Sequence, residues 1–182
     1  IGSSSDTPAV FSGMMSTDVF TCLPDDENLY QPQYEVMAGH WPENQNECVL
    51  VLTSSGHITD FLLYTLGMRD AEELDKMIDQ FSKEETVRSP EDIMTFRYQD
   101  FLDIGFKVVP ACDFYEYESE YDVWKDKTED KKYMRDLVNK GEDLVICGVI
   151  KQKEDVDAML LTTGIWYTPE LRDHLAAAAA ES

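Results

Sequence analysis

Three histidines are the first candidates for acid–base or metal chemistry, and they lie far apart in the sequence. His40 follows Gly39 in a turn-rich segment, His57 follows a Ser-Ser-Gly turn, and His174 lies just before five consecutive alanines. No HExxH or similarly close pair occurs, so there is no local signature of a zinc enzyme. We expect solvated or capping histidines, and we predict no metal ligand and no cofactor-binding residue.

A second candidate is the short stretch that contains Ser55, His57 and Asp60. These are the residue types of a hydrolytic triad, but triad members seldom come from so short a segment, and no G-x-S-x-G elbow is present. The stretch is more typical of a turn followed by a helix start at Thr59. We predict no catalytic residue and expect a protein that is not an enzyme.

Carboxylates are the third candidate, because they are hard oxygen ligands that suit calcium. Asp25, Asp26 and Glu27 are consecutive, which departs from the spaced pattern of a dedicated calcium loop. The acidic positions between 116 and 122 admit the same two interpretations, a cation site or solvated acids. Solvated acids in turns and on strand faces are the prediction in both places.

Four cysteines are spread along the chain at Cys22, Cys48, Cys112 and Cys147, with no CxxC pair. Cys48 and Cys147 lie in apolar, strand-like runs, where a free thiol behaves as a small hydrophobic group. We expect free buried thiols. A Cys48–Cys147 disulfide requires neighbouring strands with Cα atoms within about 7 Å.

Charge excludes several partners. The 182 residues include 37 acidic and 15 basic side chains, a formal net charge of -22, and the first basic residue is Arg69. Such a chain repels phosphate backbones and anionic lipid, so we predict no nucleic-acid partner. The longest apolar run, Leu144–Ile150, is far shorter than the roughly 20 residues that span a bilayer. The opening Ile1-Gly2-Ser3 suggests a fragment of a longer chain.

Apolar patterning predicts an α+β fold, with a split βαβ lobe and a small second lobe. The runs Cys48–Leu52 and Leu144–Ile150 are apolar without alternation, which is typical of the buried centre of one sheet. Alternating Tyr and acidic residues over Tyr115–Asp122 indicate a half-buried strand or hairpin. Further expected strands and helices are Tyr34–Met37, Phe106–Pro110, Met15–Leu23, Thr59–Gly67, Asp70–Phe81, Tyr98–Asp103, Glu129–Asn139 and a helix from Thr168 onward.

The chain is expected to have three parts: a flexible or helical lead-in over residues 1–29, one domain over residues 30–175, and a helix end over residues 176–182 that leads out of the fragment. Two charged or polar segments, Ser82–Asp92 and Gln152–Ala158, are candidate flexible points between lobes.

Tyr34–Val51 resembles a segment of bacterial FtsX/MacB-type ABC transporter permeases, whose pattern is roughly Tyr-x-Val-x-x-Gly-Arg-x-Pro-x-x-x-x-Glu-Val. This chain has His40 at the Arg position and Cys48 at the Val position. Similar segments follow in the same order at Ile58–Gly67, Leu144–Ile150 and Gly164–Leu171. The resemblance therefore covers most of residues 30–175.

The resemblance implies a MacB-type periplasmic core-like domain on the extracytoplasmic side of the cell membrane. It implies a role in relaying ATP-driven conformational change, or in engaging a substrate or partner outside the membrane, with no catalytic residue. The implied partners are a cytoplasmic ATP-binding subunit, reached through the membrane part of the permease, and a second permease copy. No phosphate-binding GxxxxGK[ST] motif occurs here, so the ATPase would be another chain.

A free secreted or cell-surface ligand-binding module is the alternative from another class. A hydrolase with paired acidic residues is a third. Flanking apolar stretches of about 20 residues in the gene would favour the permease, and a signal peptide without a later span would favour the free module.

Overall fold

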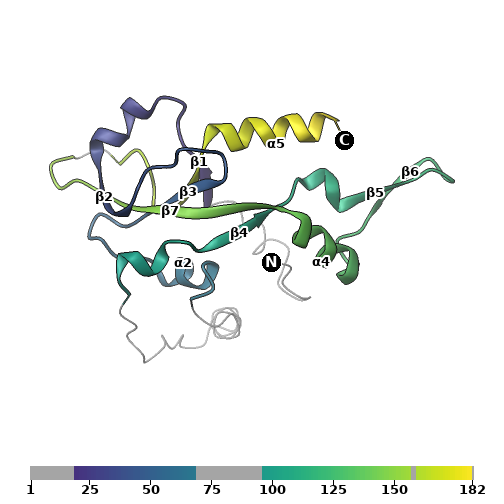
Figure 1. Cartoon of the computed structure of the whole chain (residues 1–182), viewed down its shortest axis with the longest axis horizontal. Coiled ribbons are helices and arrows are strands. Elements are labelled where there is room, and N and C mark those ends of the chain that lie inside the picture. The colour runs from purple at the N-terminus through teal and green to yellow at the C-terminus, as the bar shows by residue number, and fades with distance from the viewer. Residues whose placement is uncertain (1–18, 69–95, 157–158, 182) are drawn as a thin grey trace, which may run out of the picture.

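The computed structural model describes residues 19–68, 96–156 and 159–181, and its fold is α+β with a mixed sheet and few helices. The main sheet has six strands in this part of the chain (Figure 1). They are β1 (Phe20–Cys22), β2 (Tyr34–Gly39), β3 (Glu47–Val51), β4 (Gly105–Val108), β7 (Glu142–Gln152) and β8 (Gly164–Tyr167). The helices are α2 (Asp60–Thr65), α4 (Lys131–Lys140) and α5 (Pro169–Glu181), with short 3-10 turns at Glu27–Leu29, Gln31–Gln33, Tyr98–Phe101 and Ala111–Phe114.

Strand β7 organises the main sheet, whose order is β1-β8-β3-β7-β2 with β4 also paired to β7. β3 runs parallel to β7 along one edge. On the other edge, antiparallel β2 pairs with residues 148–152 and antiparallel β4 pairs with residues 142–145. β2 and β4 thus lie end to end along one long strand.

Both faces of the sheet centre are covered, which explains why β3 and β7 are apolar without alternation. Cys48, Leu50 and Leu52 belong to one core cluster, together with Ile146 and Val149. The intervening Val49 and Val51 face a second cluster with Ile150, Tyr34 and Trp166. The prediction that Cys48–Leu52 and Leu144–Ile150 form the buried centre of one sheet is confirmed.

Helix ends follow the sequence signals. The Thr59 side chain accepts a hydrogen bond from the Leu62 backbone N–H at the start of α2, and Gly67 has a φ of +70° just beyond its end. Thr168 caps α5 by accepting from the Leu171 N–H at 3.2 Å. The predicted helix over 129–139 is α4, capped by Asp130.

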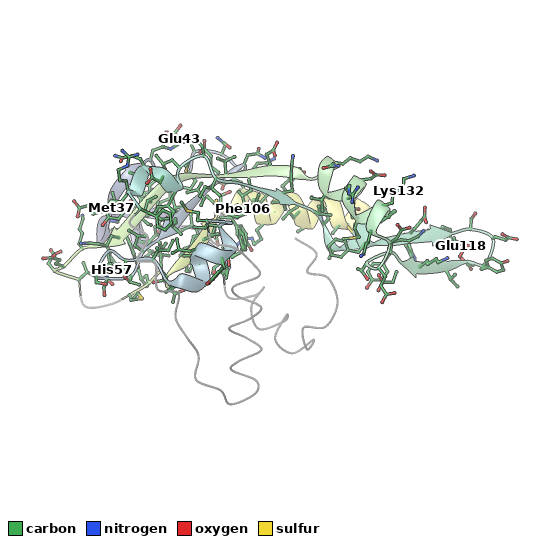
Figure 2. The ribbon with its side chains drawn as sticks, turned by 90° about the horizontal axis from the view of Figure 1, so that it is seen from below. Met37, Glu43, His57, Phe106, Glu118 and Lys132 are labelled. Atoms are coloured by element: carbon green, nitrogen blue, oxygen red, sulfur yellow. The ribbon has the colours of Figure 1, made fainter. Side chains whose placement is uncertain are left out.

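A second sheet consists of one hairpin, β5 (Tyr115–Glu118) and β6 (Val123–Asp126), which extends away from the main sheet (Figures 1 and 2). We call residues 115–126 the arm. Tyr117 pairs with Trp124 across the hairpin, with ring centroids 5.3 Å apart. Both rings are largely exposed, at 48% and 62%.

Two sequence expectations need correction. The alternation over Tyr115–Asp122 does mark a hairpin, but residues 119–122 are its turn, and its tyrosine face is exposed instead of half-buried. The lead-in is not helical at residues 20–22, because this segment is drawn into the sheet as β1, parallel to β8.

Other expectations fall partly or wholly outside the described residues. The helix over 70–81 and the connector over 82–92 lie wholly outside them. Residues 1–18 of the lead-in, residues 157–158 of the segment Gln152–Ala158 and residue 182 of the helix end also lie outside them. Of the candidate flexible segment Gln152–Ala158, Gln152 is the last residue of β7 and the residues up to Val156 form a turn held by hydrogen bonds. In this turn the Lys153 amide donates to the Gln33 carbonyl and Lys153 Nζ donates to the Pro32 carbonyl.

Val149 gives a direct test of the sheet centre. Its side chain is fully buried, so Val149→Asp would place an unpaired charge in the core and lower the free energy of unfolding by about 3 kcal/mol or more. The measurement is urea unfolding followed by circular dichroism. Val123→Asp, on the exposed arm, is the matched control and should change stability by less than about 0.5 kcal/mol. An unchanged midpoint for Val149→Asp would contradict this packing.

Candidate functional site at the junction of strands β2 and β4

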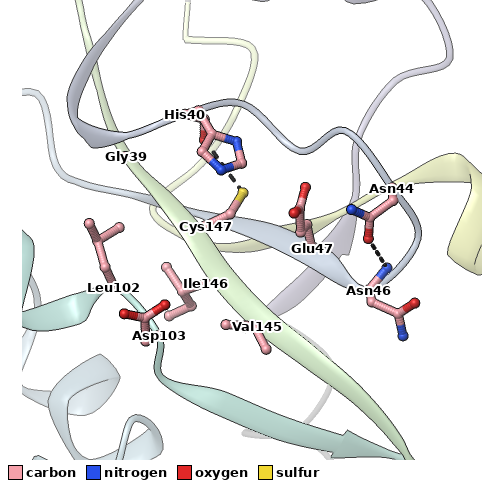
Figure 3. Close-up of a pocket in the computed structure, with 10 residues that line it drawn as sticks. All are labelled: Gly39, His40, Asn44, Asn46, Glu47, Leu102, Asp103, Val145, Ile146 and Cys147. Atoms are coloured by element: carbon pink, nitrogen blue, oxygen red, sulfur yellow. Dashed lines mark hydrogen bonds between the residues drawn. The ribbon is translucent and has the colours of Figure 1, made fainter.

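The candidate site lies where β2 ends and β4 has not yet begun along β7 (Figure 3). At this junction the His40 amide donates to the Cys147 carbonyl at 3.0 Å. The Asp103 amide donates to the Ile146 carbonyl at 3.1 Å. A pocket opens here, lined in part by His40, Glu47, Leu102, Asp103 and Cys147. The loop that follows β2 and the loop that precedes β4 therefore meet at two neighbouring residues of β7, Ile146 and Cys147.

Cys147 is the extra residue of a β-bulge. In the β3–β7 ladder, Cys48 pairs with Ile146 and Val49 pairs with Gly148, so Cys147 has no partner in the register. The bulge also changes which face the side chains occupy, because Ile146 and Val149 belong to the same core cluster although they are three residues apart. Bulges re-aim side chains and are common beside functional sites.

Two glycines let the backbones approach closely at this point. Gly39 pairs with Gly148 between β2 and β7. A Cβ on Gly148 would lie 2.1 Å from the His40 carbonyl oxygen, and one on Gly39 would lie 2.0 Å from the Cys147 carbonyl oxygen. Gly39 also has a φ of +72°, which favours glycine. The pair of glycines brings His40 next to Cys147.

Three potential metal ligands meet in the site. One ligand atom each from His40, Glu47 and Cys147 lies within 4.8 Å of the other two. The His40 side chain is exposed, and those of Glu47 and Cys147 are half-buried. The three residues come from the end of β2, the start of β3 and the bulge of β7.

Hydrogen bonds orient these groups. His40 Nδ1 lies 2.8 Å from the Trp41 carbonyl oxygen, and a carbonyl only accepts, so Nδ1 carries the proton and Nε2 the lone pair in the neutral ring. The Glu43 amide donates to Glu47 Oε2 at 2.7 Å. Burial, reinforced by the nearby Glu47 and Glu43 carboxylates, raises the pKa of the Cys147 thiol to about 12. The thiol is therefore protonated at neutral pH, and its Sγ lies 3.4 Å from the carbonyl oxygens of both His40 and Cys48.

The other histidines stand apart from this cluster. Ser55 Oγ lies 2.9 Å from His57 Nδ1, but this contact is in an exposed turn, where Thr53 also hydrogen-bonds Ser55. His174 Nε2 lies 2.7 Å from Glu142 Oε1, which joins α5 to the start of β7. The contact between Ser55 and His57 therefore stabilises a turn, and the contact between His174 and Glu142 connects α5 to β7.

The acidic candidates are used structurally. Asp26 caps the turn at Glu27–Leu29, and Asp25 forms an ion pair with Arg172 at 3.1 Å. On the arm, Glu116 pairs with Lys127 at 2.6 Å. All four cysteines are free thiols, with Cys48 fully buried.

Sequence reasoning placed His40 in a loop and Cys147 in a strand, and it did not bring them together with Glu47. The available signals were Gly148, which interrupts an otherwise apolar run, and Gly39 directly before His40. Neither signal identifies its partner strand.

No family model, curated protein or solved structure matches this chain. In the described residues, no helix is both long and apolar enough to cross a membrane.

The glycine pair can be tested by Gly148→Ala. Because the added methyl would meet backbone atoms, which cannot rotate away, we expect a loss of about 1–3 kcal/mol in the free energy of unfolding. Gly105→Ala on β4 is the control, because its Cβ would meet nothing within 4 Å. Chemical denaturation of both variants provides the comparison, and equal stability would show that β2 and β7 are not in close contact here.

Proposed function

We propose that this chain is the extracytoplasmic domain of an FtsX/MacB-type ABC transporter permease, with a MacB-type periplasmic core-like fold. In this role it has no catalytic activity of its own. It relays ATP-driven movement of the membrane part to a partner or substrate outside the membrane. The ordered resemblance over residues 30–175 supports the assignment of class.

The observation that best supports a relay function is that the arm extends from the main sheet and is fixed at its base. The exposed large hydrophobic residues of the arm are Tyr115, Tyr117, Tyr121, Val123 and Trp124, between 47% and 65% exposed. Exposed aromatic side chains on a projecting element suit contact with another protein, because they offer large apolar area at low entropic cost. The arm is accordingly the proposed contact surface.

The base of the arm is fixed to the rest of the domain. The Lys127 amide donates to the Phe114 carbonyl, and its Nζ pairs with Glu116 and lies 5.6 Å from the centre of the Tyr133 ring. Tyr133, on α4, donates its hydroxyl hydrogen to the Asp113 carbonyl at 2.9 Å. These contacts join both strands of the hairpin to α4.

Strand β7 connects this region to the sheet centre. Its 11 residues begin one residue after α4, beyond Gly141, and end opposite Tyr34. The contact between His174 and Glu142 ties α5 to the same end of β7. A displacement of α5 would therefore move the arm with the sheet, because packed, hydrogen-bonded elements transmit displacement.

The proposed partners are a cytoplasmic ATP-binding subunit, engaged through the membrane part, and a second copy of the permease. The proposed location is the cell membrane, with this domain on its outer side. Fractionation of cells that express the tagged natural gene tests the class. We expect an integral membrane protein that co-purifies with an ATP-hydrolysing subunit, whereas recovery as a free secreted protein would refute the proposal and favour a ligand-binding module.

The arm is tested by the double variant Tyr117→Ser and Trp124→Ser in the natural gene. We expect it to remain in the membrane with its ATPase but to fail to restore the transport or resistance phenotype of a deletion strain. Val36→Ser is the control, since Val36 is an apolar residue on β2 with 37% exposure and lies outside the arm. Full complementation by the double variant would show that the arm is not the working contact.

A further inference from the structure

We propose that His40, Glu47 and Cys147 form a zinc-binding site at the junction of β2 and β4. This inference rests on the geometry of the junction and does not depend on the proposed function. Imidazole nitrogen, carboxylate oxygen and thiolate sulfur are the three ligand types that Zn²⁺ takes in proteins.

The distances are compatible with a site that closes on the metal. Bonds of about 2.0–2.3 Å in a tetrahedral arrangement place ligand atoms roughly 3.4–3.7 Å apart. The three ligand atoms already lie within 4.8 Å of one another. The exposed His40 and half-buried Glu47 side chains are the groups that would move to supply the remaining approach.

The surroundings of the ligands resemble the support that metal sites require. Ligating histidines typically donate the other ring N–H to a carbonyl or carboxylate, which fixes the tautomer. His40 does this with the Trp41 carbonyl. Trp41 is itself packed on the buried Tyr30, with ring centroids 5.3 Å apart. One Glu47 oxygen accepts the Glu43 amide, which leaves Oε1 for the metal.

The β-bulge at Cys147 explains how the three ligand residues come together. In a regular ladder Cys147 would pair with a β3 residue, but as the extra residue of the bulge it points toward the end of β2. The close approach of Gly39 and Gly148 lies at the same point on β7. Two local irregularities thus act together to place one thiol beside one imidazole.

Binding has a defined proton balance. Zn²⁺ takes cysteine as thiolate, histidine as neutral imidazole and glutamate as carboxylate, so formation of the zinc–sulfur bond at Cys147 releases the thiol proton to solvent. The negative charge of the Glu47 and Glu43 side chains favours a divalent cation here. Three protein ligands leave a fourth tetrahedral position for water, and all three ligand residues line the pocket.

The test is a titration of the reduced, chelator-treated 182-residue chain with Co²⁺, followed by displacement with Zn²⁺. Cobalt reports sulfur ligation through a thiolate-to-metal charge-transfer band, which weak binding to surface carboxylates does not produce. We expect one equivalent of Co²⁺ to give this band and one equivalent of Zn²⁺ to abolish it. Zn²⁺ should also raise the melting temperature, because it binds the folded state.

Variants identify the ligands. Cys147→Ser should abolish the band, and His40→Gln and Glu47→Gln should each weaken Zn²⁺ binding by about 10- to 100-fold or more. Cys22→Ser and Cys112→Ser are the matched thiol controls and should bind normally. His40→Gln alters an exposed side chain, so it tests the site even if Cys147→Ser unfolds. Absence of the band in the wild type, its persistence in Cys147→Ser, or unchanged affinity in His40→Gln would overturn the proposal.

Discussion

Strand β7 is the element on which the rest of the structure depends, because it hydrogen-bonds to three other strands. β3 occupies one edge, while β2 and β4 share the other. Such a strand must be apolar on both faces where the sheet is covered. It must also adjust its register between residues 145 and 148, where its partner on one edge changes from β4 to β2. The bulge at Cys147 meets the second requirement. The sheet centre and the pocket both depend on this one strand.

The sequence was informative wherever one short segment specified its own environment. The apolar runs around Val49 and Val149 predicted buried strands because burial on both faces excludes polar side chains at every position. Thr59 and Thr168 predicted helix starts because a cap is a local hydrogen bond. These features need no knowledge of a distant partner, and the structure contains all of them.

Features that depend on a distant partner were missed or misjudged. Phe20 is in a strand because it pairs with Ile165, which no local pattern reveals. The tyrosines of the arm alternate like half-buried residues, but no element within residues 19–68, 96–156 and 159–181 covers them. Likewise, His40 looked like a loop residue, and only the bulge on β7 places Cys147 beside it. For the candidate site, the sequence shows an imidazole, a carboxylate and a thiol, but it does not predict that His40, Glu47 and Cys147 lie close together.

The pairing of β1 with β8 joins the beginning and the end of the described chain. Phe20 can pair with Ile165 only after every intervening residue has been synthesised, and contacts of such long sequence separation form late and slowly. While β8 is in the sheet but β1 has not yet paired with it, β8 is an exposed sheet edge, which can accept a strand from another molecule. Docking of three residues, Phe20–Cys22, therefore covers this edge and reduces the risk of association between partly folded chains.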